Sequence, residues 1–300
     1  MTDTPNLRRG EPDEARHRAS SRDGTGNPVP WAILPSVALQ LALFAAPLAI
    51  MLLYSFWTSR NYQIVAEWTL DNYKTFFASW TYPWVLFRTL WTSFIITAVT
   101  LLAAYPFTYF IVRYTSRWQK VLIGLVILSF WTSGLLRAYA WMAILGNGGI
   151  INKGLQMLGL IDGPLPFLIY STFATVLVMT YFSFPFAVIA LYTSLERMDW
   201  TLVQAANDLG ASPARAFLHV TLPQTMPGVI SASVLTFVTA IGMFFVPLLV
   251  GSSSSIMIAP LISNQMQAFQ LGLGAALSFI IALIVMTILA AAWRYVEPKH

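Results

Sequence analysis

Side chains that could act as catalysts or metal ligands are scarce in this sequence. It has no cysteine, and its three histidines (His17, His219 and His300) are too far apart to give the spacing of a metal site. No G-x-x-x-x-G-K-[ST] motif occurs to hold the phosphates of ATP, and the nearest glycine cluster, Gly146 to Gly149, continues into IINKG. We therefore expect no catalytic residue and no metal site on this chain.

One ionisable residue, Arg137, lies inside a long apolar segment. A charge inside a membrane span is by default a hint of function. Counted along a helix from Lys120, Arg137 lies roughly 25 Å away, near the far interface, where its side chain could extend into water. Both a structural role and a contact with a solute are compatible with this position.

The composition predicts an integral membrane protein. The chain is 57% hydrophobic and 10% charged, whereas soluble domains contain about 25% charged residues. A bilayer core needs about 20 apolar residues per helix, and six segments qualify. They are Trp31–Trp57, Thr89–Val112, Val121–Leu145, Phe167–Leu191, Gly228–Val250 and Leu271–Trp293. The expected fold class is all-α, with six transmembrane helices within residues 31–293.

The basic residues predict the orientation. With both termini in the cytoplasm, twelve of the 17 Lys and Arg residues fall on inner segments, as the positive-inside rule requires. The same rule accounts for the net charge of +5 without a nucleic-acid partner. Residues 1–30, with five arginines, five acidic residues and many Pro, Gly and Ser, are expected to form a disordered cytoplasmic tail. Residues 294–300 are expected to form a second cytoplasmic tail.

A hydrophilic segment in the second half of the chain predicts a cytoplasmic helical hairpin, residues 199–223. Asp199 can cap the start of a helix over Trp200–Leu209, and Gly210 can supply its left-handed C-terminal cap. An apolar stripe follows the helical period: Leu202, Ala205, Ala206 and Leu209. Because alanines allow a close approach to the backbone, this stripe suits docking into a groove of a partner. A hairpin that lies on the membrane surface fits the same spacing.

The second arm of the hairpin begins and ends with a proline. Ser212 followed by Pro213 is typical of an N-cap and a first helical turn. Pro223 is expected to end this helix, because a proline disfavours helical geometry at the residue before it.

The hairpin resembles the cytoplasmic motif of the type I ABC importer permeases. That motif has Glu-Ala-Ala, a glycine four positions after the second alanine, and a final Ile-x-Leu-Pro. Here Gln204-Ala205-Ala206, Gly210 and Val220-Thr221-Leu222-Pro223 fall on the same spacing, with Gln204 and Val220 as departures. The segments Phe130–Leu155 and Phe182–Asp199, and FFVPLLVG followed by IAPLISNQ, look like the spermidine/putrescine branch of these permeases.

The resemblance implies that the hairpin is a coupling helix, which inserts into a groove of a cytoplasmic ATPase. The residues implied in ATPase coupling are Gln204, Ala205, Ala206, Asp208, Leu209, Gly210, Ala211, Leu222 and Pro223. It further implies a non-catalytic translocating subunit in the bacterial inner membrane, with no cofactor of its own. Its expected partners are an ATPase dimer that binds ATP and Mg, a second permease, expected to be a heterodimeric homologue, an extracytoplasmic solute-binding protein and membrane lipid.

The same resemblance points to a polyamine as cargo. In polyamine-transporting relatives an acidic residue is expected near Met243, but no span here contains one, so an opine or amino-acid-like solute stays an alternative. The candidate substrate-path residues are Trp131, Thr132, Ser133, Arg137, Tyr139, Trp141, Met243 and Phe244. Their aromatic rings could stabilise a cation by cation–π attraction, although packing between helices would explain them equally. An intramembrane enzyme or a channel is disfavoured because the spans lack facing ionisable groups.

A segment expected outside the membrane, Gly148–Ile161, has the pattern of a short amphipathic helix. It could dock a solute-binding protein or lie in the membrane interface without a partner.

Overall fold

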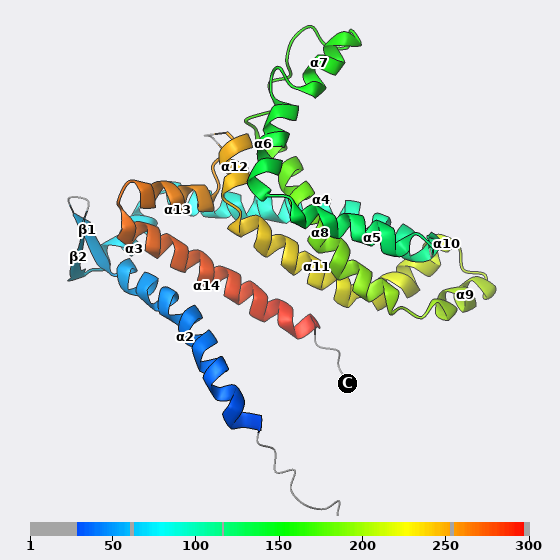
Figure 1. The fold of residues 1–300 in the computed structure, drawn as a ribbon, viewed down its shortest axis with the longest axis horizontal. Helices are drawn as coiled ribbons and strands as arrows, with labels where there is room; N and C mark the ends of the chain where they lie inside the picture. The colour runs from blue at the N-terminus through cyan, green and yellow to red at the C-terminus, as the bar shows by residue number, and fades with distance from the viewer. Residues whose placement is uncertain (1–28, 61–62, 116, 253–254, 297–300) are drawn as a thin grey trace, which may run out of the picture. The chain divides into compact units, whose positions relative to one another are not determined.

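The computed structural model describes residues 29–60, 63–115, 117–252 and 255–296, and these are almost entirely helical (Figure 1). Tertiary contacts separate two units, Met1–Ile50 and Met51–His300. All but the last two residues of the predicted N-terminal tail, and residues 297–300 of the C-terminal one, lie outside the described residues. The first unit contributes most of helix α2 (Val29–Ser55), which runs through Pro35 and Pro47 without a break.

The second unit contains the other elements. In chain order they are β1 (Trp57–Arg60), β2 (Gln63–Trp68), α3 (Asp71–Ala78), α4 (Thr81–Tyr114), α5 (Gln119–Leu128), the short 3-10 helix η1 (Ser129–Trp131), α6 (Gly134–Leu145), α7 (Ile150–Met157), α8 (Thr172–Glu196), α9 (Trp200–Asp208), α10 (Pro213–Ala216), the π-helical turn η2 (Phe217–Thr221), α11 (Leu222–Gly242), α12 (Phe245–Val250), α13 (Ile258–Gln267) and α14 (Leu271–Val296). Strands β1 and β2 pair antiparallel, a ribbon that the aromatic-rich sequence of this region did not reveal.

The number of spans agrees with the sequence prediction. Among the described residues, five helices are long and apolar enough to cross a bilayer, and a bent pair of helices would make a sixth. The fourth span lies later than predicted, at Thr172–Glu196 instead of Phe167–Leu191. Ser171 caps α8 by accepting a hydrogen bond from the amide of Ala174, which fixes the start of this helix.

The third span is not the continuous helix predicted over Val121–Leu145. The chain bends by 95° between Gln119–Trp131 and Gly134–Met157. Thr132 and Ser133 have non-helical backbone angles, with ψ values of 137° and 130°. The helix starts again at the next residue, Gly134. The helical rise counted from Lys120 to Arg137 therefore does not measure the depth of Arg137, and that estimate was wrong.

The fifth span is also interrupted. It was predicted over Gly228–Val250, but the helical path starts at Pro213 and ends at Gly242. Met243 is extended (φ −77°, ψ 119°), and the short helix α12 then begins at Phe245. This part of the bundle therefore contains a second broken helix, and its break lies at Met243 and Phe244.

Helices α4, α8 and α11 pack along one another and form the centre of the second unit. Most buried residues of α4 are small or hydroxylated: Thr89, Thr92, Ser93, Thr97, Thr100, Ala104 and Thr108. Four of these hydroxyls donate to the carbonyl four residues earlier, at 2.7 to 2.8 Å. Small side chains with internally satisfied hydroxyls let membrane helices approach closely.

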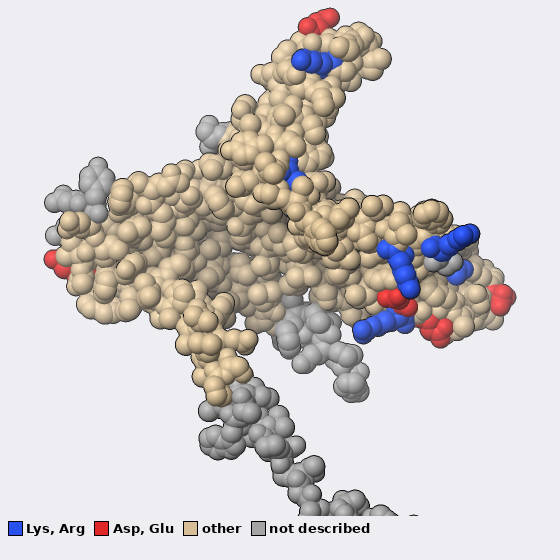
Figure 2. Space-filling model, in the orientation of Figure 1, with Lys and Arg blue, Asp and Glu red and all other residues tan. Residues whose placement is uncertain are grey.

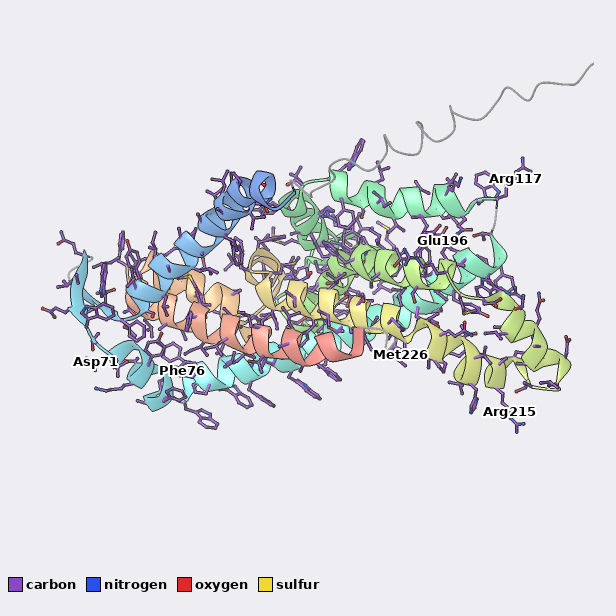
Figure 3. The ribbon with its side chains drawn as sticks, turned by 90° about the horizontal axis from the view of Figure 1, so that it is seen from below. Asp71, Phe76, Arg117, Glu196, Arg215 and Met226 are labelled. Carbon is purple, nitrogen blue, oxygen red and sulfur yellow. The ribbon has the colours of Figure 1, made fainter. Side chains whose placement is uncertain are left out.

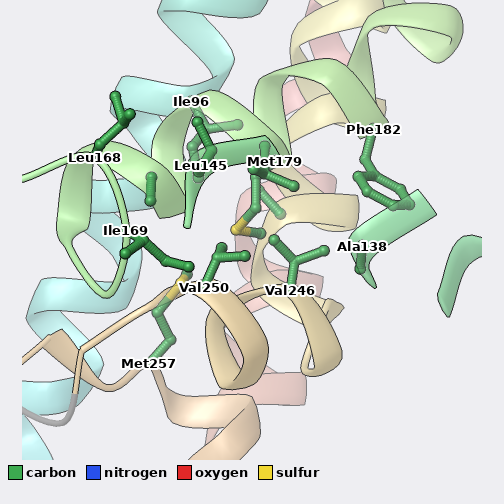
Figure 4. Packing of buried hydrophobic residues seen from close by; sticks show 13 residues of the cluster. Ile96, Ala138, Leu145, Leu168, Ile169, Met179, Phe182, Val246, Val250 and Met257 are labelled. Atoms are coloured by element: carbon green, nitrogen blue, oxygen red, sulfur yellow. The ribbon is translucent and has the colours of Figure 1, made fainter. Parts of the chain in front are cut away.

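The main apolar core lies where the two broken helices meet α4 and α8 (Figure 4). It joins Ile96 of α4 and Met179 of α8 to Ala138 of α6 and Val246 of α12, all with no exposed surface. Because both short helices contribute to this core, their bends are held by packing against α8.

Most charged side chains lie at the ends of the bundle or on the projecting region of α7, and Figure 2 shows one basic side chain near the middle. Arg117, Glu196 and Arg215 lie at the end that carries the hairpin, whereas Asp71 lies at the opposite end (Figure 3). This distribution is typical of a protein whose central band contacts hydrocarbon.

Candidate functional site

The first arm of the hairpin has the predicted caps. Asp199 Oδ1 accepts hydrogen bonds from the amide of Thr201 at 2.9 Å and from its hydroxyl at 2.7 Å. These bonds favour the carboxylate and hold the pKa of Asp199 below its usual value. Helix α9 ends at Asp208, and Gly210 takes the left-handed conformation with φ +85°. The sequence signals at both ends of this arm were therefore correct.

The second arm begins as predicted but does not end at Pro223. The hydroxyl of Ser212 accepts from the amide of Arg215 at 3.4 Å, and Pro213 occupies the first turn. The helix then continues through η2 into α11, with Pro223 inside it. The wider π-helical turn, formed by Phe217–Thr221, ends two residues before Pro223. In a regular α-helix the proline ring would clash with the carbonyl four residues earlier, and the proline nitrogen has no N–H to donate. The hairpin therefore joins the membrane helix without a flexible link.

A small core holds the two arms together and separates the alanines of the predicted stripe. Met198, Val203 and Ala216 are buried there, with Ala206 and Val220 packed against them. Ala205 is exposed, and Leu209 is 90% exposed at the tip. Hence Ala206 faces inward, and the outward apolar surface consists of Leu202, Ala205 and Leu209.

The remaining predicted coupling residues also divide into exposed and half-buried ones. Gln204, Asp208 and Gly210 are exposed on the first arm and its turn, while Ala211 is half-buried. Leu222 is half-buried against α4, where it lines an apolar groove, and Pro223 is exposed.

Aromatic side chains connect the hairpin to α4. The guanidinium carbon of Arg113 lies 4.9 Å from the centroid of the Trp200 ring, and Trp200 packs edge-on against Tyr109 at 5.8 Å. Phe217 of the π-helical turn contacts Tyr109 at 5.9 Å and Tyr105 at 5.6 Å, both edge-on. We call these five residues the aromatic bridge. Sequence reasoning missed it, although a tryptophan next to a capping aspartate was a usable signal.

The candidate path residues lie around the two helix breaks. Thr132 and Ser133 form the first break, and Met243 and Phe244 form the second. Phe245 connects them: its ring lies 5.7 Å from that of Phe182, and a Cβ at Gly134 would come within 3.2 Å of it. In transporters, breaks of this kind mark places where polar backbone lines a cavity.

Arg137 belongs to this region through ring contacts. Its guanidinium carbon lies 4.6 Å from the Phe182 centroid and 6.0 Å from that of Tyr181. Its Nε atom is buried and has no hydrogen-bond partner within the described part of the chain. Tyr181 in turn packs against Trp141 at 5.4 Å. Arg137, Trp141 and Met243 therefore surround one core, and Tyr181 and Phe182 are neighbours that the sequence pattern did not indicate.

Two other path candidates point outward. Trp131 is 86% exposed and Tyr139 is half exposed. The exposed parts of these two rings are available to lipid or to a second subunit.

The amphipathic helix predicted over Gly148–Ile161 is shorter in the structure, and its exposure follows the prediction only in part: Lys153 and Gln156 are exposed and Ile151 and Leu155 are half-buried, but Asn152 and Ile150 depart from the pattern. Helix α7 covers Ile150–Met157. Its polar Asn152 is buried, where it donates to the carbonyl of Gly146 and accepts from the amide of Leu165. Ile150 and Met157 are exposed. The buried amide of Asn152 thus fixes the loop, while Ile151 packs against the main apolar core.

No cluster of three His, Cys, Asp or Glu residues that could hold a metal ion occurs among the residues that the structure describes. The arrangement thus combines an exposed apolar tip on the hairpin with two helix breaks that pack on one core.

The amino-acid sequence is similar to those of several bacterial permease proteins. No protein-family model matches the sequence. The chain is 34% identical over 227 residues to the spermidine/putrescine transport system permease protein PotB of Escherichia coli (strain K12), across 75% of this chain and 82% of the relative. It is 34% identical over 197 residues to PotB of Haemophilus influenzae, across 66% and 68% of the two chains. It is also 34% identical over 199 residues to the inner membrane ABC transporter permease protein YdcU of Escherichia coli, across 63% of each chain.

The fold is similar to that of solved transporters. A chain of a bacterial ABC transporter involved in the import of the acidic polysaccharide alginate superimposes with a TM-score of 0.68, at 18% identity, over 89% of this chain and 94% of that one. A second structure, of the alginate transporter in complex with an alginate pentasaccharide-bound periplasmic protein, gives 0.66 at 19% identity, over 87% and 91%. At this identity the likeness shows the fold alone.

Proposed function

This chain belongs to the ABC transporter permeases, in the PotB-like spermidine/putrescine branch, and from that membership we propose that its cargo is a polyamine or a similar small amine. It is a multi-pass permease of the inner membrane and the non-catalytic, translocating component of an ABC importer. The cargo, the partners and the orientation are the proposed parts.

The observation that supports the cargo is the 34% identity to PotB over 75% of this chain. A flexible polycation crossing a membrane needs carbonyls, aromatic rings or carboxylates along its path. The region of the two breaks supplies rings from Tyr181, Phe182 and Trp141. The acid expected near Met243 is absent, so we propose that the second permease or the binding protein supplies the carboxylates. An opine or amino-acid-like solute is the second candidate, favoured by Arg137 in that region.

We propose that the hairpin is the site of coupling to a cytoplasmic ATPase dimer, which binds ATP and Mg. Its exposed apolar tip around Leu209 suits a groove, because a side chain with 90% exposure is free to be buried by a partner. The continuous helix from Pro213 to Gly242 and the aromatic bridge give the hairpin two rigid connections to the membrane helices. In this scheme both termini lie in the cytoplasm, and a solute-binding protein docks on the opposite side.

The cargo proposal is tested by titrating the cognate solute-binding protein with putrescine and spermidine, then measuring ATP hydrolysis by the reconstituted complex. We expect tight binding of at least one polyamine and stimulation of hydrolysis by the loaded binding protein. Tight binding of a sugar or an inorganic oxyanion, without a response to either polyamine, would contradict the cargo while leaving the importer in place. Stimulation by an amino-acid-like solute alone would select the second candidate.

A further inference from the structure

A polar groove lies between α8 and α11 on the hairpin side of the second unit. It has a volume of about 630 Å³ and is lined by Ala190, Thr193, Ser194, Arg197, Met198, Gln224, Pro227, Gly228 and Ser231. None of these residues belongs to the candidate path around the two helix breaks. We propose that this groove, named here the inner groove, is the water-filled cytoplasmic part of the translocation path; the inference rests on the proposed importer function.

Three polar side chains of the inner groove have no partner among the residues that the structure describes. The half-buried side chains of Ser194 and Gln224 make no hydrogen bond to another described residue, and Arg197 forms no ion pair with any of them. Thr193 and Ser231, by contrast, donate to carbonyls of their own helices at 2.9 and 2.8 Å. Burying an amide or a hydroxyl without a partner is costly in hydrocarbon. A groove with such a lining is therefore stable when it holds water, and it can pass a hydrated polar solute.

The groove continues the face of α8 that meets the first helix break. Phe182 contacts Arg137, and Phe186 packs against Phe130 at 4.9 Å, next to that break. Ala190 and Thr193 follow Phe182 and Phe186 on the same face of α8. Each of these residues comes three or four positions after the one before it, which is the spacing of neighbours on one helical face. One side of α8 thus leads from the region of the breaks to the inner groove.

The opposite side of α8 is closed, so this face is the one available for a path. Ala187, Val188, Leu191 and Leu195 are buried in a cluster with residues of α4 and α5. On the groove side the two helices touch at Gly228, where any added Cβ would overlap the side chain of Ser194. The close contact forms the floor of the groove.

The absence of native cysteines allows a direct test of accessibility. Ser194→Cys and Ser231→Cys would each be introduced into the full transporter complex in inside-out vesicles. Met226→Cys is the matched control, because Met226 lies two positions from Gly228 on α11, a rotation of about 200° around the helix. It is 39% exposed and is not among the residues that line the groove. A membrane-impermeant methanethiosulfonate would then be added from the cytoplasmic side.

We expect both groove cysteines to react at least tenfold faster than the control, and their labelling to slow when the ATPase is trapped with vanadate. Equal rates at the groove and control positions would overturn the proposal, and so would failure of both groove cysteines to react. In the latter case, crosslinking to the second permease would identify the groove as a subunit interface. Cargo-stimulated ATP hydrolysis is read separately, so a failed groove and a failed importer function give different results.

The charge of Arg197 gives a second readout. A single positive charge near the reacting thiol attracts an anionic sulfonate reagent and repels a cationic ammonium reagent of similar size. At Ser194→Cys we expect the anionic reagent to react about threefold faster relative to the cationic one than at Met226→Cys. Arg197→Gln should remove this difference. A ratio that Arg197→Gln leaves unchanged would show that the guanidinium does not face the same water-filled space, contrary to the proposal.

Discussion

The hydroxyls of Tyr105 on α4 and Thr225 on α11 lie 2.8 Å apart. Thr225 also donates to the carbonyl of Thr221 at 2.9 Å, at the end of the π-helical turn. The ring of Tyr105 meanwhile packs edge-on against Phe217, at the start of that turn. One tyrosine of α4 therefore holds both ends of the irregular turn through which the hairpin enters the membrane helix. Since π-helical turns inside α-helices are often found at functional sites, the connection between hairpin and bundle is the first place to test.

The aromatic bridge predicts that Trp200→Leu uncouples the hairpin from α4. The change removes an edge-on aromatic pair and the Arg113 stacking contact, which together are worth about 1–2 kcal/mol. We expect cargo-stimulated ATP hydrolysis to fall at least fivefold, with basal hydrolysis and complex assembly retained, as measured in proteoliposomes.

Trp118→Leu is the matched control, because Trp118 lies immediately before α5 and is largely exposed, outside the bridge. If both variants lose stimulation equally, the effect comes from the loss of any tryptophan near this end of the bundle and not from the bridge.

The exposed tip of the hairpin predicts a docking defect for Leu209→Asp. A carboxylate at this position cannot be buried in an apolar groove without a large desolvation cost, while the free hairpin should tolerate it because the side chain is 90% exposed. We expect the ATPase subunit to dissociate or lose stimulation, with the thermal midpoint of the isolated permease unchanged. Gln204→Glu should keep normal coupling. Retention of the ATPase by Leu209→Asp would place the docking surface elsewhere.

Local signals in the sequence predicted the hairpin well, while features that depend on distant contacts were missed. Asp199 and Gly210 act through their own backbone neighbours, so their residue types were sufficient. The break at Thr132 is different: its segment is as apolar as a continuous span, and the bend is held by Ala138 and Phe182, which pack in a core assembled from five helices. The prediction that Pro223 ends the second helix of the hairpin failed for the same reason. The π-helical turn that accommodates this proline is supported by Tyr105, more than a hundred residues earlier in the chain.

The close contact between α8 and α11 predicts that Gly228→Ala destabilises the permease. The added methyl group would overlap Ser194, and overpacking of this kind costs about 1–3 kcal/mol. Gly124→Ala on α5 is the matched control, because nothing lies within 4 Å of its new Cβ, and it should be neutral or slightly stabilising. Thermal unfolding in detergent measures both. Partial rescue of Gly228→Ala by Ser194→Gly would confirm the clash, whereas equal stability of both glycine variants would show that the helices separate at no cost.

The distribution of charges predicts that the hairpin and both termini lie in the cytoplasm. Arg117, Glu196 and Arg215 gather at the hairpin end (Figure 3), and basic residues favour the inner side. A reporter that is active only after export should be inactive when fused after His300 and active when inserted in the loop between α6 and α7. An active reporter after His300 would reverse the orientation, and with it the proposed cytoplasmic contact.

Arg137 separates the two cargo candidates, because its positive charge acts on them in opposite directions. A cationic group about 6 Å from a guanidinium is disfavoured by about 3 kcal/mol at an effective dielectric of about 20, and a carboxylate is favoured by as much. If the cargo is a polyamine, Arg137→Gln should lower the concentration for half-maximal transport at least tenfold. If the cargo carries a carboxylate, the same change should raise it. Arg137→Lys is the control, since it keeps the charge but loses the planar stacking on Phe182. Loss of thermal stability in both variants, without any change in half-maximal concentration, would restrict Arg137 to holding α6 against α8 and remove it from the transport path.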